Sequence, residues 1–382
     1  MRILFNYFFL VSLLVPPLVT LSAYAPAYAA KPVKVAAIYA MSGEAVAISF
    51  DHLLAVRIAL EEINAAGGVL GRPIKLIELD NQSTALGSRK AAIEAVNMEV
   101  AAVVGGPWSS HAISMAKVLQ PAKIPMISPI ATNPKVTRIG EYIFRTCFID
   151  AYQGQMLAQF AYEDLDATTV AVLTNVDQVY AIDLSEEFIK KFSALGGRVS
   201  ARIDYIENLT HYGDLITELS QHEFDAVILP GYTRDSAQII KAARKMGIST
   251  PVIGGDGWSP LMRNYAREEL ENCYYLTHWH KDLKNDKSVA FTQKAMEKLG
   301  QKSVMSGMAL AYDSMYLLAD AMRRAGTTEA KKLRDALANT RDFTGVTGRI
   351  VYDRHRNPVK PAVILKFENG DFTLFKQTIP GR

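Results

Sequence analysis

The chain alternates short apolar runs with longer amphipathic segments, and this pattern restricts its fold more than any other feature. In the first part, strands are predicted at 33–40, 74–80, 100–104 and 125–128, and helices at 50–66, 85–98 and 110–119. The helix at 50–66 would place Phe50, Leu53, Val56, Leu60 and Ile63 on one buried face. Apolar strands that alternate with helices predict an α/β fold with a doubly wound parallel sheet, covered on both faces.

A second series of the same design follows Arg145. Helices at 151–164, 180–195, 212–221 and 233–246 alternate with strands at 170–174, 199–206, 226–229 and 251–253. Residues 286–338 are predicted to be mainly helical, followed by strands at 349–352, 362–367 and 372–376. So long a chain exceeds what one hydrophobic core usually serves, so we expect two lobes. No low-complexity linker separates them, so we expect several direct crossings.

The first 29 residues are predicted to be a cleaved secretory leader. Met1–Leu21 is nearly all apolar, carries Arg2 as its only charge, and leads to Ala27-Tyr28-Ala29. An uncleaved membrane anchor is the alternative, because the run approaches the length of a spanning helix. No second run of that length follows, so we expect the mature protein to be dissolved in the periplasm.

The charge balance gives no indication of a nucleic-acid partner. Lysine and arginine number 42 against 39 acidic residues, and loss of Arg2 leaves 41 against 39, a formal charge of +2. Cys147 and Cys273 are the only cysteines. They form one disulfide in the exported protein, or remain as two buried thiols; the sequence leaves both readings open.

Two loops place hydroxyl groups where the chain turns from a strand toward a helix. They are residues 105–110 (GGPWSS) and 128–134 (SPIATNP). Backbone N–H groups, hydroxyls and the positive end of a helix dipole suit a carboxylate. Farther on, Gly254-Gly255-Asp256-Gly257 ends a strand with one fixed negative charge. Together these loops predict a site for a zwitterion.

Four ordered segments carry a more specific resemblance. They are Ala40-Met41-Ser42-Gly43, residues 61–74 (EEINAAGGVLGRPI), residues 127–134 (ISPIATNP) and Phe144-Arg145-Thr146. From about Lys31 to its end, the chain resembles the leucine/isoleucine/valine-binding protein family, the extracytoplasmic receptors of ABC importers.

This resemblance implies a type I periplasmic-binding-protein fold, with two α/β lobes joined by three crossovers. Lobe 1 would comprise 30–147 and 276–357, and lobe 2 would comprise 148–275 and 358–382. The crossovers would fall near 145–149, 272–277 and 353–361, so both cysteines would lie in hinge segments. The ligand would be held in the cleft between the lobes.

The resemblance also assigns roles to individual residues. Ser109 and Thr132 match hydroxyl donors to a ligand α-carboxylate, and Ala131 matches a backbone contact to the α-ammonium. Asp256 matches the acidic residue that neutralises the ammonium, with the hydroxyl of Tyr232 beside it. Simpler roles stay open: a helix cap for Ser109 or its neighbour Ser110, a turn for Thr132, and a cap of the turn near Ser259 for Asp256.

The side-chain pocket is where the sequence departs from the family pattern. Ile48 falls near a position where relatives often carry an aromatic wall, and Trp108 replaces a smaller residue. Trp108, with Tyr180 and Trp258, would form a wall for an aliphatic chain, stack on an aromatic ring, or belong to the core.

Catalytic and metal-binding interpretations lack the residues they need. There is no Gly-x-Ser-x-Gly elbow, and His111 beside Ser110 would point elsewhere on a helix. His278, His280 and Cys273 lack the further ligand that a metal site requires. We therefore expect no enzyme activity, no cofactor and no metal.

The sequence thus predicts a monomeric receptor that binds an amino acid, branched-chain or otherwise apolar or aromatic, and delivers it to a membrane ABC permease. The alternatives are a binding protein for an aromatic or short-chain carboxylate, a ligand-sensing receptor domain, and an exported hydrolase. Asp256 favours an amino acid, because a ligand without a cation would leave its charge unpaired.

Overall fold

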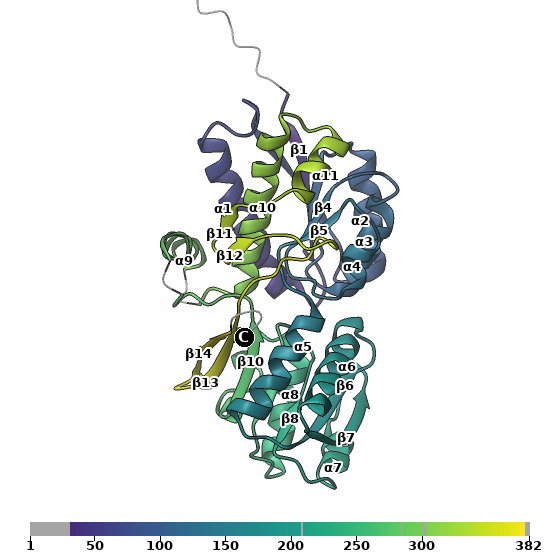
Figure 1. Cartoon of the computed structure of the whole chain (residues 1–382), viewed down its shortest axis with the longest axis vertical. Helices are drawn as coiled ribbons and strands as arrows, with labels where there is room; N and C mark the ends of the chain where they lie inside the picture. The colour runs from purple at the N-terminus through teal and green to yellow at the C-terminus, as the bar shows by residue number, and fades with distance from the viewer. Residues whose placement is uncertain (1–30, 208, 284, 301–302, 379–382) are drawn as a thin grey trace, which may run out of the picture.

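The computed structural model describes residues 31–378 except 208, 284, 301 and 302. The predicted leader lies outside the described residues. Figure 1 shows two lobes, one above the other, with chain segments passing between them. Within the described residues, no helix combines the length and apolar character needed to cross a bilayer.

The upper lobe in Figure 1 is built on a parallel sheet with the strand order β2-β1-β3-β4-β5. The strands are β1 (Val33–Tyr39), β2 (Ile74–Asp80), β3 (Ala102–Gly105), β4 (Met126–Ser128) and β5 (Ile143–Arg145). The helices packed around it are α1 (Val46–Ala65), α2 (Ala85–Asn97), α3 (Ser109–Leu119), α4 (Lys135–Arg138), α9 (Asp286–Leu299), α10 (Ser306–Ala325) and α11 (Ala330–Ala338), and a hairpin joins β11 (Phe343–Gly345) to β12 (Gly348–Ile350).

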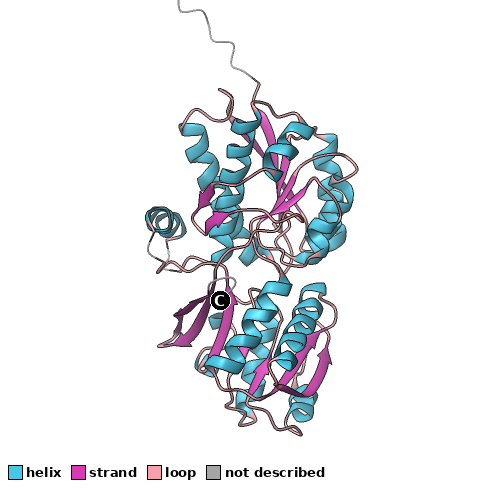
Figure 2. Cartoon of the chain, in the orientation of Figure 1, coloured by secondary structure: helices cyan, strands magenta, loops and turns pink. Residues whose placement is uncertain are grey.

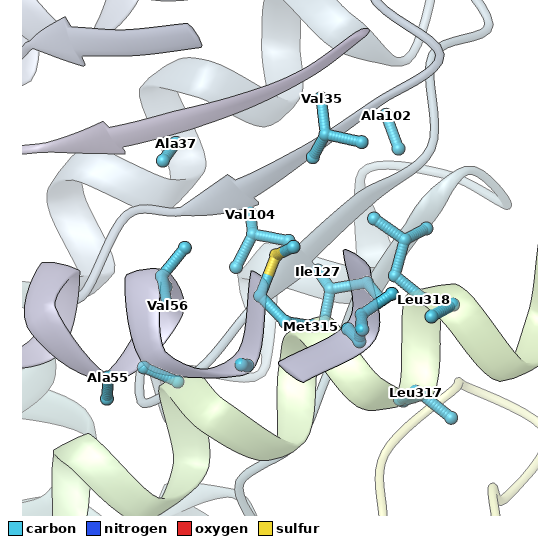
Figure 3. Close-up of a cluster of buried hydrophobic side chains, with 14 of the residues drawn as sticks. Val35, Ala37, Ala55, Val56, Ala102, Val104, Ile127, Met315, Leu317 and Leu318 are labelled. Atoms are coloured by element: carbon cyan, nitrogen blue, oxygen red, sulfur yellow. The ribbon is translucent and has the colours of Figure 1, made fainter. Parts of the chain in front are cut away.

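Both faces of this sheet are buried, as the apolar strands predict. Val35 and Ala37 of β1 belong to a core shared with α1 and α10, whereas Ala36 and Ile38 point to the opposite face, toward α2 and α3. Figure 3 shows the first of these cores, in which Met315 and Leu318 of α10 lie under the sheet.

The lower lobe contains the second sheet, with the order β14-β13-β10-β9-β8-β6-β7 (Figures 1 and 2). Its parallel strands are β6 (Thr169–Asn175), β7 (Arg198–Tyr205), β8 (Ala226–Ile228), β9 (Val252–Gly254) and β10 (Cys273–Thr277), and its antiparallel strands are β13 (Ala362–Glu368) and β14 (Asp371–Thr378). The helices are α5 (Asp150–Gln159), α6 (Val179–Ala194), α7 (Gly213–Leu219) and α8 (Thr233–Lys245), with a π-helical turn at Phe160–Asp164 and 3₁₀ turns at Pro260–Asn264 and Glu268–Leu270.

The parallel parts of the two sheets have the same topology. In each lobe the second strand of the series lies beside the first on one side, and the third lies on the other, so the order reverses at β1/β3 and at β6/β8. In open α/β sheets, ligands bind outside the carboxyl ends of the strands at this reversal. The predicted two-lobed α/β fold is confirmed, with an antiparallel pair added to the second sheet.

The second crossover lies at the end of its predicted segment. Residues 273–277 form β10, which pairs with β9 on one side and with β13 on the other, and the chain leaves the lobe after this strand. Because β10 has a neighbouring strand on each side, its apolar residues lie inside the lobe. The described chain passes between the lobes at β5–α5, after Thr277, and between β12 and β13. We therefore propose that the chain is divided into lobes as predicted, except that the boundary between residues 275 and 276 is moved to follow Thr277.

Two further expectations are settled by burial. Leu53, Val56 and Ile63 are buried on one face of α1 as predicted, whereas Phe50, predicted on the same face, is 52% exposed. Cys147 and Cys273 are both free, buried thiols in the described structure. The Cys147 thiol lies 3.4 Å from the carbonyl of Ala131, whereas Cys273 belongs to the core of the second lobe.

The close approach of β1 and β3 depends on Gly105, whose φ is +148°. A Cβ atom there would lie 2.2 Å from the carbonyl oxygen of Ile38 in β1. Gly105 therefore fixes the turn that leads into Pro107, Trp108 and Ser109.

We predict that Gly105→Ala lowers the free energy of unfolding by about 3 kcal/mol or more, because β1 and β3 must separate. Gly67→Ala is the matched control: Gly67 also has a positive φ, but a Cβ there has nothing within 4 Å. The control should lose only about 1 kcal/mol. Urea denaturation measures both, and equal losses would contradict the steric explanation.

Candidate functional site

A cavity of about 590 Å³, including the space at its open mouth, lies between the lobes. From the first lobe it is lined by the segments after β3 and β4, by α1 and by the start of α10. From the second lobe it is lined by α6, by the segments after β8 and β9, and by β10. The cavity thus faces the strand-order reversal of both sheets.

Most of the residues predicted from the sequence line this cavity. They are Trp108, Ser109 and Thr132 from the first lobe and Tyr180, Tyr232 and Asp256 from the second. Two predicted residues do not line it. Ser110 is the second residue of α3, and Ala131 is buried in the first lobe, where its carbonyl accepts hydrogen bonds from Arg145 Nη1 at 2.8 Å and the Cys147 thiol at 3.4 Å. The neighbouring Ile130 lines the cavity instead.

The wall of the first lobe joins the two hydroxyl-bearing loops. The Ser109 hydroxyl accepts a hydrogen bond from the backbone N–H of Asn133 at 3.3 Å. Ser109 does not cap α3, because the capping position is Trp108, whose side chain makes no cap hydrogen bond. The first N–H groups of α3 and the Ser109 hydroxyl proton are therefore disposed to serve an anion in the cavity.

The wall of the second lobe presents Asp256, which follows β9 and is 8% exposed. Its Oδ1 accepts a hydrogen bond from Gln153 Nε2, and its Oδ2 lies 2.9 Å from His278 Nε2. The turn near Ser259 is capped by Ser259 itself, so Asp256 is not its cap. A carboxylate has about four acceptor positions, so Asp256 retains capacity for a ligand donor.

The pKa values of two groups near Asp256, His278 and Asp150, are shifted. Burial lowers the pKa of His278, although the Asp256 carboxylate opposes this, so the ring is neutral and donates Nε2–H to Asp256. Burial, reinforced by the charge of Asp256, raises the pKa of Asp150 well above its usual range, with partial compensation by the Thr132 hydroxyl. Both shifts favour the uncharged form of the group concerned.

An aromatic stack connects the two lobes. The ring of Tyr232 is stacked on the ring of Trp108 at a centroid distance of 4.5 Å. The ring of Tyr180 is stacked on the ring of Tyr232 at a centroid distance of 5.5 Å. Trp108 also lies 5.1 Å from the ring of His111. Because these ring faces already contact one another, Trp108 is not free to stack on a ligand ring between itself and Tyr232.

Polar contacts cross the same interface. Asn133 of the first lobe donates hydrogen bonds to the Val179 carbonyl and to Asp183 Oδ2, both at 2.9 Å. Lys135 forms an ion pair with Asp183 at 3.7 Å. The lobes are therefore in direct contact beside the cavity.

Sequence reasoning missed several residues of the site. His52, Met305, Ser306 and Gly307 line the cavity, and Gln153 and His278 hold Asp256. Met305–Gly307 lies in the helical tail, where no local motif marked a site. From the sequence, His278 is a candidate metal ligand only; within the described residues, no group of three His, Cys, Asp or Glu side chains is placed to hold a metal ion.

The fold and the cavity define a bilobal solute receptor, and the chain belongs to the periplasmic binding protein family, whose model matches residues 32–371. Relatives within the family are named for branched-chain amino acids. The chain is 26% identical over 315 residues to the Leu/Ile/Val-binding protein homolog 1 of Brucella abortus, covering 82% of this chain and 84% of the relative.

Solved structures agree with this assignment. A leucine-binding protein from Thermotoga maritima is 32% identical, with a TM-score of 0.87 over 91% of this chain and 99% of its own. A branched-chain amino acid transporter substrate-binding protein from Streptococcus pneumoniae, solved with isoleucine, is 29% identical, with a TM-score of 0.85 over 91% and 99% of the two chains. The predicted family resemblance is confirmed.

The buried ring of His111, which lies beside Trp108, predicts that the free energy of unfolding falls in acid. Burial lowers the pKa of His111 to about 4, whereas an unfolded histidine titrates near 6.5. The unfolded chain therefore binds a proton between these values that the folded protein does not, and the free energy of unfolding falls as the pH falls from about 6.5 toward 4.

We predict that His111→Gln, which keeps a polar group near Asn81, reduces this pH dependence by about 1 kcal/mol per pH unit. The measurement is urea denaturation of both proteins at several pH values between 4 and 7.5. An unchanged slope in the variant would contradict the assignment of this proton to His111.

Proposed function

We propose that this protein is the extracytoplasmic receptor of an ABC importer and that it binds a free amino acid as a zwitterion between its lobes. The observation that carries the proposal is the meeting of Ser109 and Thr132 with Asp256 in one cavity, across the two lobes. Relatives named for branched-chain amino acids support the same ligand class.

The ligand carboxylate would lie at the start of α3, where the hydroxyl of Ser109 and the helix N–H groups stabilise negative charge. The Tyr232 hydroxyl now interacts with the backbone N–H of Ser109. A bound carboxylate would take the place of the Tyr232 oxygen at this N–H group. It would also accept a hydrogen bond from the Tyr232 hydroxyl. The ligand ammonium would pair with Asp256, which Gln153 and His278 hold in place.

Binding of this kind favours closure, because the two charges of one ligand are held by different lobes. A ligand shifts the balance between open and closed forms only through contacts that the closed form alone makes. Tyr180, Tyr232 and Asp256 supply those contacts from the second lobe. We propose a transport role without enzyme activity, in keeping with the family to which the chain belongs.

The remaining assignments belong to the same proposal. The protein would reach the periplasm by cleavage of the leader after Ala29, act as a monomer and present its closed form to a membrane permease. A screen of amino acids and small carboxylates by thermal shift tests the ligand class, since a compound that binds only the folded protein raises its melting temperature. Stabilisation by simple carboxylates but not by amino acids would contradict the zwitterion site.

We predict that Asp256→Asn weakens amino-acid binding by about 100-fold or more, close to 3 kcal/mol, because the ligand ammonium loses its counter-charge. Asp204→Asn, an exposed change in the same lobe, is the control. Calorimetry measures both affinities, and circular dichroism confirms the fold. Undiminished affinity in Asp256→Asn would remove Asp256 from the site.

We predict that Ser109→Ala weakens binding by about 1.5–3 kcal/mol, the value of one hydrogen bond to a charged group. Ser110→Ala is a close control, because the adjacent Ser110 does not line the cavity. If the two variants lose equal affinity, the effect comes from the start of the helix and not from the Ser109 hydroxyl.

A further inference from the structure

The residues that line the cavity include polar groups that an aliphatic ligand would leave unsatisfied. Within the described part of the chain, three residues that line the cavity each carry a buried polar atom without a hydrogen-bond partner. These atoms are Nε1 of Trp258, Nδ1 of His52 and Oγ of Ser306. Trp258 and His52 are each only 3% exposed, so bulk water does not serve them. A buried polar group without a partner costs free energy, so each such group needs an explanation, and a ligand contact is one.

One of these groups, Ser306, lies at the start of a long helix. Met305, Ser306 and Gly307 line the cavity, and α10 runs for 20 residues from Ser306. The capping position, Met305, offers no side-chain hydrogen bond to the first turn. Its N–H groups and the positive end of the helix dipole therefore act on the cavity.

The histidine is held against this helix start. A Cβ atom at Gly307 would lie 2.0 Å from His52 Nε2, so only glycine allows the ring to approach. Burial lowers the pKa of His52 to about 4, and the ring is neutral near pH 7. The indole of Trp258 can only donate a hydrogen bond, and the hydroxyl of Ser306 can donate or accept.

This donor-rich set excludes two kinds of side chain. A cationic side chain would meet the positive end of α10 and the indole N–H. A second carboxylate would need a cation, and the residues lining the cavity, as far as the structure describes them, include no lysine or arginine. An uncharged acceptor is the group that the wall can satisfy.

We propose that the ligand is an amino acid whose side chain carries an uncharged hydrogen-bond acceptor, a hydroxyl or a carboxamide, which is bound by Trp258, Ser306 and the start of α10. This inference rests on the proposed function, since the same zwitterion site holds the backbone of the ligand. It replaces the aliphatic or aromatic side chain expected from the sequence.

Isosteric amino acids test the inference directly. Threonine and valine have nearly the same shape, as do asparagine and leucine, and within each pair only the first carries the polar group. Calorimetry on the full mature protein, unfolded and refolded to remove carried ligand, gives the four affinities. We expect the polar member of at least one pair to bind about tenfold or more tightly than its isostere.

Variants assign the preference to the proposed groups. Ser306→Ala and Trp258→Phe should each reduce that preference by about fivefold or more, whereas Ser193→Ala, at an exposed serine outside the cavity, should not change it. Valine and leucine binding as tightly as their polar isosteres would overturn the inference while leaving the proposed function intact. Failure of all amino acids to bind would instead contradict the proposed function.

Discussion

The parallel arrangement of both sheets is the constraint on which the site depends. Parallel strands deliver all their carboxyl ends to one edge, and the reversal of strand order opens a crevice at that edge. Because the same order occurs in each lobe, Trp108 and Ser109 leave the first sheet beside its reversal, and Tyr232 leaves the second sheet beside its own. The two crevices face one another, and the cavity is the space between them.

The two walls of the cavity differ in chemistry because the first lobe stabilises an anion, whereas the second lobe presents a carboxylate. The first lobe offers hydroxyls and a helix start, which stabilise an anion without a formal cation. The second lobe buries a carboxylate and supports it with neutral donors, Gln153 and His278, in place of lysine or arginine. A fully paired ion would leave nothing for a ligand, whereas neutral donors hold Asp256 in position and keep its charge available. The stacked rings of Trp108, Tyr232 and Tyr180 then supply the apolar contact between the lobes.

Local patterns in the sequence were sufficient for the elements that depend on near neighbours. The strand at Ile74–Asp80 was predicted with its observed bounds, and the loops carrying Ser109, Thr132 and Asp256 were found from their hydroxyls, glycines and charge. The start of α1 was misplaced because its capping residue, Ala45, offers no side-chain signal. The role of β10 was missed because its pairing with β13 joins residues about 90 positions apart, a contact that no local pattern encodes. His52 and Ser306 were missed for the same reason, because they lie on α1 and α10, which are far apart in the sequence.

The central claim is that one ligand is held by opposite charges on opposite lobes. A crystal structure of the protein with a bound amino acid tests it most directly. The account predicts the ligand carboxylate within hydrogen-bond distance of the Ser109 and Thr132 hydroxyls, and the ammonium within the same distance of Asp256. A ligand bound in the reverse orientation, or bound by one lobe alone, would contradict it.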